Sequence, residues 1–171
     1  KAHPIKENFL PKNIEKYAPA MVELAKKLHT ENKKDLEDKI RDILIFVPGL
    51  MEIDFIVKEL ADVKGLLAIP LHRENFQKGT SEYQSIFVDI ETLGASITRR
   101  CIVSTALAET GVTIETVKYV IDSGWARTSD YYPPFGRHAL VTKPTTKDSA
   151  MQREGRSGRK GPGEWYPMYT K

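Results

Sequence analysis

The sequence predicts an α/β fold in which helices cover both faces of a parallel sheet. Short, almost wholly apolar runs rich in β-branched residues recur along the chain, and such runs are typical of strands buried on both faces. Amphipathic helical patterns alternate with these runs, and this alternation is typical of parallel strands joined by crossover helices. One polar stretch at 125–143 interrupts the alternation, so we also expect an inserted β-hairpin.

The composition is that of one ordinary globular domain. The chain has 171 residues, of which 40% are hydrophobic and 29% charged, and this length suits a single well-packed core. The net charge of only +3 means that any site for a polyanion must be local. Cys101 is the only cysteine, which excludes an internal disulfide and is typical of a reducing, intracellular compartment.

No pattern in the sequence indicates a metal site or a membrane span. One cysteine and four scattered histidines lack the ligand spacing of a structural zinc site. No apolar run approaches the roughly 18 residues that a spanning helix needs, so we expect no membrane association. The chain begins at Lys1 without a methionine or a signal pattern, and we therefore interpret it as a fragment of a longer protein.

The first part of the chain is expected to lead into the domain. Residues 1–13 contain two prolines and no clear period, and we interpret them as a linker or a first strand, with the domain itself spanning 14–171. An amphipathic helix is predicted from Ile14 because apolar residues recur at helical spacing as far as Leu28. Residues 32–41 are mostly charged and are expected to be its solvated end or a second short helix.

Five apolar runs supply the predicted strands. They lie at 43–47, 66–71, 101–105, 117–122 and 164–169. Helices are predicted at 50–62 and, in a shorter form, at 81–87, with Thr80 or Ser81 as N-cap. Ligands of parallel sheets collect beyond the carboxyl ends of the strands, so the small and polar residues at these ends form an expected binding rim.

The inserted stretch has the pattern of a β-hairpin followed by a helix. Two polar segments flank Pro133-Pro134-Phe135-Gly136, which places the hairpin tip at the prolines and the glycine. Decoration and function both remain open for such an insertion. A helix is then expected from Lys147, with Thr145 or Thr146 as its N-cap.

Residues 152–159 carry three arginines spaced three apart, with two glycines between them. On a helix or a tight turn this spacing projects the arginines from neighbouring positions on one side. Packing alone does not need clustered guanidinium groups, because like charges repel and are costly to desolvate. A bound phosphate would explain the cluster; the alternative is a solvated basic helix end followed by a Gly-Pro-Gly turn.

Four ordered motifs resemble those of one enzyme family. Residues 152–163 resemble motif VI of superfamily-two helicases, with the Gly-Pro-Gly ending of the DEAH-box branch, and residues 104–114 resemble its motif V. Residues 44–49 and the helix after them resemble motif IV, and Pro70-Leu71-His72 followed by 83–87 is similar in order and spacing. The chain is therefore identified as a member of this family: the second RecA-like domain of a DEAH-type (DExH) helicase, with viral members among the candidate sources.

The resemblance implies roles for the basic segment. Arg156 and Arg159 match the motif arginines that contact the γ-phosphate, and the second of them is the arginine finger. Gln152 matches the glutamine that helps to place the phosphate and the attacking water. A fixed positive fork suits this task because it neutralises charge on the transferred phosphoryl group. Arg153 is expected to be structural.

The resemblance also implies contacts to the nucleotide. Phe87 matches the aromatic residue that stacks on the base, although a core phenylalanine would fit the same pattern. Gly111 stands where the family usually has a serine that senses the nucleotide, so the usual hydroxyl is absent here. Glu115 stands in place of the usual ribose-contacting aspartate and keeps a carboxylate.

Further positions match the family's nucleic-acid path. Ser104 and Thr105 match residues near the strand's phosphates, and Gly49 belongs to the same expected set. Ala106 replaces the usual asparagine. The hairpin falls where the family carries an element that parts the two strands, so its tip is expected to act there, through Pro133, Pro134 and Phe135.

The chain contains neither a Gly-x-x-x-x-Gly-Lys-Ser/Thr loop nor an Asp-Glu-x-His quartet. The resemblance implies that ATP or another NTP, with Mg²⁺, binds mainly to a preceding first RecA-like domain. Single-stranded nucleic acid, RNA in preference to DNA, would cross both domains. The expected location is the cytoplasm or nucleus, or the host cell or virion for a viral protein. The predicted function is the second motor domain of an NTP-dependent helicase or translocase; the alternative is a non-catalytic RecA-like module for nucleic-acid binding or assembly.

Overall fold

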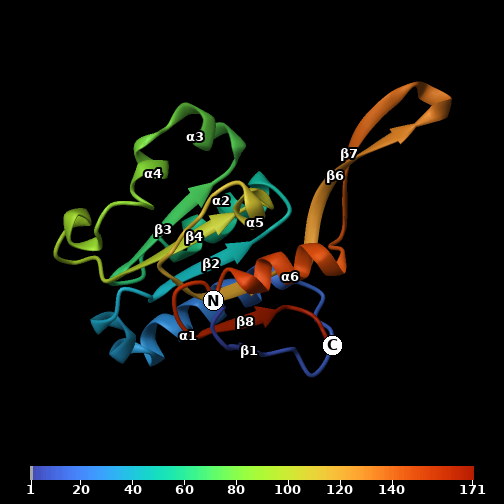
Figure 1. Ribbon diagram of the computed structural model, residues 1–171. Helices are drawn as coiled ribbons and strands as arrows, with labels where there is room; N and C mark the ends of the chain where they lie inside the picture. Colours follow the sequence, from blue (N-terminus) through green and yellow to red (C-terminus); the bar gives the residue numbers. More distant parts are fainter. Residues whose placement is uncertain (1) are drawn as a thin grey trace.

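A computed structural model describes residues 2–171 and shows a six-stranded sheet across them (Figure 1). All five pairings in this sheet are parallel. In spatial order its strands are β1 (Ile5–Glu7), β8 (Gly163–Pro167), β5 (Val117–Asp122), β2 (Asp42–Phe46), β4 (Arg99–Ser104) and β3 (Leu66–Leu71). The predicted α/β fold with a parallel RecA-like sheet is therefore confirmed.

Strand β2 shows why the apolar runs form the centre of the sheet. All five of its residues are buried. Successive side chains of a strand point to opposite faces, so Ile43 and Ile45 enter one hydrophobic core while Leu44 and Phe46 enter the other. A strand that feeds two cores must be apolar at nearly every position.

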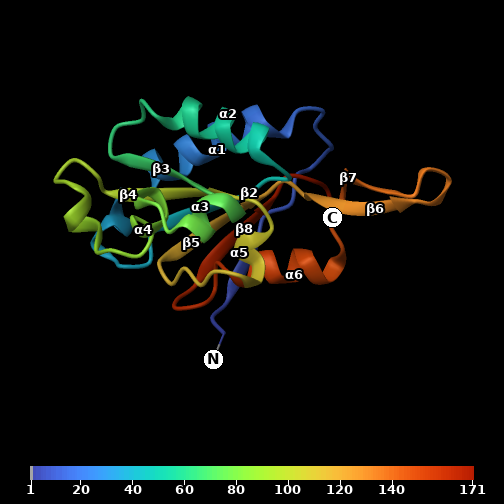
Figure 2. The same ribbon diagram turned by 90° about the horizontal axis from the view of Figure 1, so that it is seen from above.

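Helices cover both faces of the sheet (Figure 2). On one face lie α1 (Tyr17–Glu31) and α2 (Leu50–Leu60); on the other lie α3 (Arg73–Lys78), α4 (Ser81–Gln84), α5 (Leu107–Thr110) and α6 (Lys147–Gly155). The first predicted helix starts at Tyr17 rather than Ile14, and Thr80 is the residue that caps α4, through a bond from the Tyr83 N–H.

The charged segment after α1 is not simply solvated. Residues Lys33–Glu37 form the 3₁₀ turn η1, in which Asp35 is only 3% exposed. Its carboxylate accepts hydrogen bonds from Lys118 Nζ at 2.7 Å and from the Tyr119 hydroxyl. Burial alone would raise the pKa of Asp35, but these two bonds and nearby cations outweigh it and lower the pKa. The segment is thereby anchored to β5.

The predicted hairpin is present and stands away from the sheet (Figure 1). Its antiparallel strands are β6 (Trp125–Tyr132) and β7 (Arg137–Pro144), joined by the 3₁₀ turn η3 (Pro133–Phe135). A further 3₁₀ turn, η2 (Ile90–Leu93), precedes β4. Residues Ile5–Glu7 of the N-terminal segment form β1 at the sheet edge, where Ile5 packs against Gly158 of the arginine segment.

Candidate nucleotide and nucleic-acid sites

Helix α6 and the turn after it carry the residues to which the family resemblance assigns phosphate contacts. The Thr146 side chain caps the helix by accepting the Ser149 N–H at 3.1 Å. Gln152 and Arg156 lie four residues apart, and this spacing puts them on the same side of the helix. Gln152 is exposed, Arg156 is half-buried, and Arg159 is exposed in the turn that follows.

The guanidinium of Arg156 makes one hydrogen bond within the protein and has one nitrogen without a partner among the described residues. Its Nη2 donates to the Glu109 carbonyl, whereas its Nη1 is buried without a hydrogen-bond partner among the residues that the structure describes. Burial and the neighbouring Arg159 lower the pKa of Arg156, while Glu109 opposes this effect. A buried donor without a partner is costly, and an anion bound beside Arg156 and Arg159 would reduce the repulsion between the two cations.

Arg153 uses its whole guanidinium inside the protein. It is fully buried, and its Nε and Nη1 donate at 2.7 Å to Glu109 and Asp122 respectively. Its Nη2 donates to the Trp125 carbonyl at 3.2 Å, and its Cζ lies 4.9 Å from the centre of the Phe46 ring. All three guanidinium nitrogens have protein partners and the side chain is inaccessible to a ligand, so these contacts give Arg153 a structural role that joins α5, α6 and the hairpin root.

Phe87 and Glu115 line one cavity of about 410 Å³, together with Lys39, Arg41 and Arg100. The Phe87 side chain is 49% exposed and contacts Tyr83 edge-on, with ring centroids 5.1 Å apart. It is therefore not a core phenylalanine, and its exposed ring is available to a flat ligand. The Glu115 carboxylate oxygen Oε1 lies 3.6 Å from Nζ of Lys160, the residue after Arg159. The cavity therefore adjoins the arginine segment.

Gly111 closes the short helix α5 and is tightly packed. Its N–H donates to the Leu107 carbonyl at 2.9 Å. A Cβ added at Gly111 would lie 2.9 Å from that same oxygen and 2.8 Å from a Leu107 methyl carbon. A serine at this position would require the α5 turn to shift, which gives a packing reason for the glycine.

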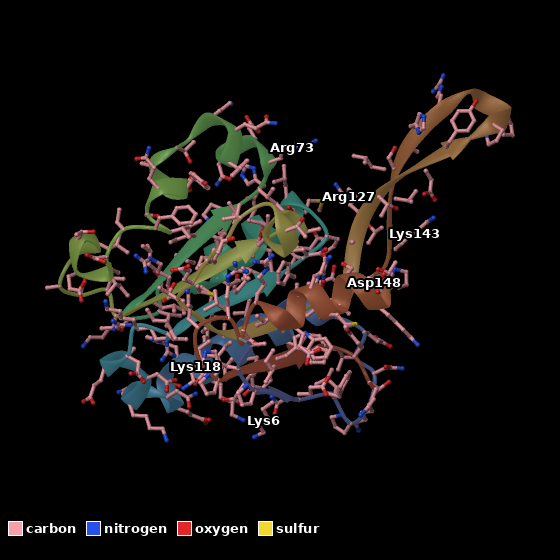
Figure 3. The ribbon with its side chains drawn as sticks, in the orientation of Figure 1. Lys6, Arg73, Lys118, Arg127, Lys143 and Asp148 are labelled. Atoms are coloured by element: carbon pink, nitrogen blue, oxygen red, sulfur yellow. The ribbon has the colours of Figure 1, made fainter. Side chains whose placement is uncertain are left out.

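A second cavity of about 400 Å³ lies at the carboxyl ends of β2, β3 and β4. It is lined by Gly49 and Thr105, as expected, and also by His72, Arg73 and Arg127. A Cβ added at Gly49 would lie 3.0 Å from Cζ of Arg127, so this guanidinium covers the Gly49 backbone. Arg127 lies on the side of the hairpin that faces Arg73 (Figure 3).

Ser104 does not reach this cavity. Its side chain is fully buried at the end of β4, and its hydroxyl donates to the Thr105 carbonyl at 2.8 Å. The structure thus brings Gly49 and Thr105 together at the rim and leaves Ser104 beneath it. Of the hairpin tip, Pro133 and Pro134 are exposed at the far end, away from both cavities (Figure 1), while the Phe135 side chain lies outside the described residues.

Residues 21–161 match the family described as the helicase conserved C-terminal domain. The chain belongs to this helicase family. The expected resemblance to a helicase C-terminal domain is confirmed.

The helicase domain is similar in sequence to parts of two longer proteins. It is 38% identical over 177 residues to B962L of African swine fever virus, whose name proposes an RNA helicase; the match covers 93% of this chain and 18% of that protein. It is 37% identical over 138 residues to the ATP-dependent RNA helicase HrpA of Borreliella burgdorferi, covering 79% of this chain and 16% of that protein. The helicase domain thus spans about a sixth of the length of these relatives.

Solved structures share the fold of the helicase domain. The crystal structure of the Escherichia coli DEAH/RHA helicase HrpB superposes with a TM-score of 0.79 at 24% identity, over 99% of this chain and 20% of that one. A second structure, of the E. coli DExH-box NTPase HrpB, gives a TM-score of 0.80 at 23% identity, over 100% of this chain and 20% of that one.

Two arginines that the sequence pattern did not indicate line the second cavity. Arg73 and Arg127 lie far apart in the sequence. They line one cavity because α3 and the root of the hairpin both lie at the carboxyl-terminal edge of the sheet. The sequence held one signal for Arg73, which follows the end of β3 by two residues. Within residues 2–171, no cluster of three or more potential metal-ligating side chains occurs, and no helix is long and apolar enough to cross a membrane.

Proposed function

We propose that this helicase domain is the second motor domain of an NTP-dependent RNA helicase or translocase. The observation that carries the proposal is the pair Arg156 and Arg159, in which a half-buried guanidinium with an unpaired Nη1 lies beside an exposed one. Two neighbouring guanidinium groups repel each other, and a phosphate bound between them would offset this repulsion. A module without a phosphate ligand has no physical need for it, which speaks against a non-catalytic role.

We assign the first cavity to the nucleotide and the second to the nucleic-acid backbone. In the nucleotide half-site, the phosphates would meet Arg156 and Arg159, the base would stack on Phe87, and the ribose would approach Glu115. Gln152, one helical turn before Arg156, would orient the phosphate and the attacking water. Mg²⁺ bound elsewhere would neutralise phosphate charge, but the described residues offer no suitable acidic cluster, so we assign no metal step to this domain.

The rim at Gly49 and Thr105 would hold the nucleic-acid backbone. The Thr105 hydroxyl and the backbone at Gly49 can donate to phosphates, and Arg73 and Arg127 supply the positive charge that dominates such affinity. RNA is the proposed strand because relatives of this domain are named RNA helicases. An intracellular location follows from that substrate.

The proposal predicts that the site is completed only in the full-length protein. The chain of residues 1–171 alone should release no phosphate from ATP above the buffer blank, because it has no phosphate loop or magnesium ligands. The full-length protein should hydrolyse ATP, with stimulation by single-stranded RNA. Robust turnover by the domain alone would contradict the split site, and an inactive full-length protein would favour the non-catalytic module.

A second prediction separates the hairpin tip from the motor. Replacing residues 133–136 with Asn-Gly, a favourable two-residue hairpin turn, removes the tip and leaves both strands in register. In the full-length protein this change should abolish unwinding of a tailed RNA duplex and preserve most RNA-stimulated ATPase activity, because the tip lies far from both cavities. An equal loss of the two activities would show that the tip is a structural element.

A further inference from the structure

We propose that Arg100 is a positioning residue of the nucleotide half-site. Its buried guanidinium holds the backbone on both sides of Phe87 and so presents the Phe87 ring to a nucleobase. The inference rests on the proposed function, in which the base stacks on Phe87. It adds a residue that acts on nucleotide binding without touching the nucleotide.

Arg100 lies in β4 and is only 2% exposed. Its Nε donates to the Ser85 carbonyl at 3.0 Å, and its Nη2 donates to the Val88 carbonyl. These two carbonyls belong to the residues two positions before and one position after Phe87, so one planar group holds the chain on both sides of the ring. Because the Arg100 side chain is so little exposed, it acts on a ligand through Phe87 rather than by direct contact.

The segment 81–97, which contains Phe87, leads from α4 into β4 (Figure 1). Apart from the two bonds from Arg100, the hydrogen bonds of this segment within the described part of the chain all join neighbours in residues 79–97. Ile86 adds an apolar anchor, since its side chain is 2% exposed and belongs to one of the two hydrophobic cores. Arg100 therefore supplies the polar attachment of the segment to the sheet, and Ile86 supplies its packing.

The buried carboxylate of Asp42 holds Arg100 in turn. Its Oδ1 accepts the Arg100 backbone N–H at 2.9 Å, and its Oδ2 lies 3.4 Å from Arg100 Nη1. The same Oδ2 accepts the Thr116 hydroxyl at 2.5 Å, and Thr116 directly follows Glu115. One carboxylate thus connects the holder of Phe87 with the neighbour of Glu115, and these are the two side chains assigned to the base and the ribose.

A ring that is fixed before binding favours stacking. Phe87 is 49% exposed and contacts Tyr83 only edge-on, so side-chain packing alone leaves much of the ring uncovered. Ordering a loose segment when the ligand arrives would reduce affinity. Because Arg100 fixes the backbone beforehand, we expect its loss to weaken only the part of the affinity that comes from the base.

The test compares ADP with ribose 5-diphosphate, which lacks the base, on the full-length protein. Isothermal titration calorimetry with these two diphosphates reads binding without hydrolysis of a γ-phosphate. The parent should bind ADP about tenfold more tightly than ribose 5-diphosphate, the scale of one base–aromatic stack. Phe87→Ala should bind the two ligands alike.

Arg100→Lys should bind ADP about fivefold more weakly than the parent, because a ring that is not fixed keeps little of the stacking gain. Its affinity for ribose 5-diphosphate should equal that of the parent. The lysine keeps a positive charge beside Asp42, but one ammonium does not reproduce the planar fork that spans both carbonyls. In the Phe87→Ala background, Arg100→Lys should weaken ADP binding no further.

Arg99→Lys is the matched control, since Arg99 is the preceding residue of β4 and is fully buried as well. Its guanidinium donates to the Leu28 and Asn32 carbonyls at 3.0 Å, on the opposite face of the strand from Arg100. Thermal melts should show that both lysine variants are destabilised. Only Arg100→Lys should lose the preference for ADP, which separates positioning from a loss of stability.

Hydrogen–deuterium exchange of the unliganded parent tests the same point without a variant, should Arg100→Lys prove too unstable to titrate. The amides of Phe87 and Thr92 make the same kind of local bond, to the Gln84 and Asp89 carbonyls at 3.1 and 3.0 Å. The Phe87 amide should exchange more slowly, because Arg100 holds the chain beside it. Equally fast exchange of both amides would show that the chain around Phe87 is not held, and would overturn the inference.

The titrations distinguish two kinds of failure. If Arg100→Lys kept the preference of the parent for ADP while Phe87→Ala lost it, the positioning role would be wrong and the base site would stand. If Arg100→Lys weakened both ligands equally, its effect would not depend on the base, and the inference would again be wrong. If Phe87→Ala itself kept the preference, the base site of the proposed function would be contradicted and the inference would fall with it.

Discussion

Arg159→Ala in the full-length protein should lower the rate of ATP hydrolysis by roughly 10³-fold, the scale of an arginine finger. Arg159 is exposed in the turn after α6, beside Arg156, so its guanidinium can meet a phosphate held by a second domain. Nucleotide affinity should change far less, because the contact matters most when charge shifts onto the transferred group. Single-turnover hydrolysis and a nucleotide titration measure the two effects.

The chain offers close controls for this variant. Arg159→Lys should not restore the rate, since an ammonium keeps the charge and loses the planar two-point fork. Lys160→Ala removes the next cation, which lies 3.6 Å from Glu115 on the surface, and should hydrolyse within a few-fold of the parent. Arg156→Ala should resemble Arg159→Ala with a larger loss of binding. Should Arg159→Ala fold and turn over normally, the basic segment would be better assigned to the nucleic-acid path.

Arg153→Ala should destabilise the domain by about 3–5 kcal/mol, as when one partner of a buried ion pair is removed. Its loss would leave the Glu109 and Asp122 carboxylates without their main partner, because both bond to its guanidinium at 2.7 Å. For a chain of this length, the melting temperature should fall by roughly 10 °C. Thermal unfolding of the 171-residue chain, followed by circular dichroism, measures this change.

The same experiment needs two comparison variants. Arg153→Lys should also be clearly destabilised, because one ammonium cannot serve two carboxylates and the Trp125 carbonyl together. Arg73→Ala removes an exposed arginine of α3 and should alter stability by no more than about 0.5 kcal/mol. If Arg153→Ala melted like Arg73→Ala, the buried network would not be holding α5, α6 and the hairpin root together.

Local patterns in the sequence were sufficient to predict the architecture, whereas the chemistry of the basic segment stays a prediction. The strand 43–47 could be predicted because a strand between two cores must be apolar at nearly every position, and β2 is buried throughout. The hairpin could be predicted because Pro133, Pro134 and Gly136 mark a turn between polar strands. The arginine cluster was singled out because clustered guanidinium groups suit phosphate, and the roles of Arg156 and Arg159 came from the family resemblance. These signals lie within a few residues of one another.

Tertiary structure alone decided which of those residues are exposed and which are buried. Phe87 could have been a core residue until its ring was found 49% exposed in a cavity with Glu115. Ser104 looked equivalent to Thr105 until the end of β4 buried its hydroxyl. Arg153, which lies within the same run as Arg156, donates hydrogen bonds from all three guanidinium nitrogens to residues 28 to 44 positions away. Exposure and hydrogen bonding depend on such distant contacts, and no local pattern records which segments will meet.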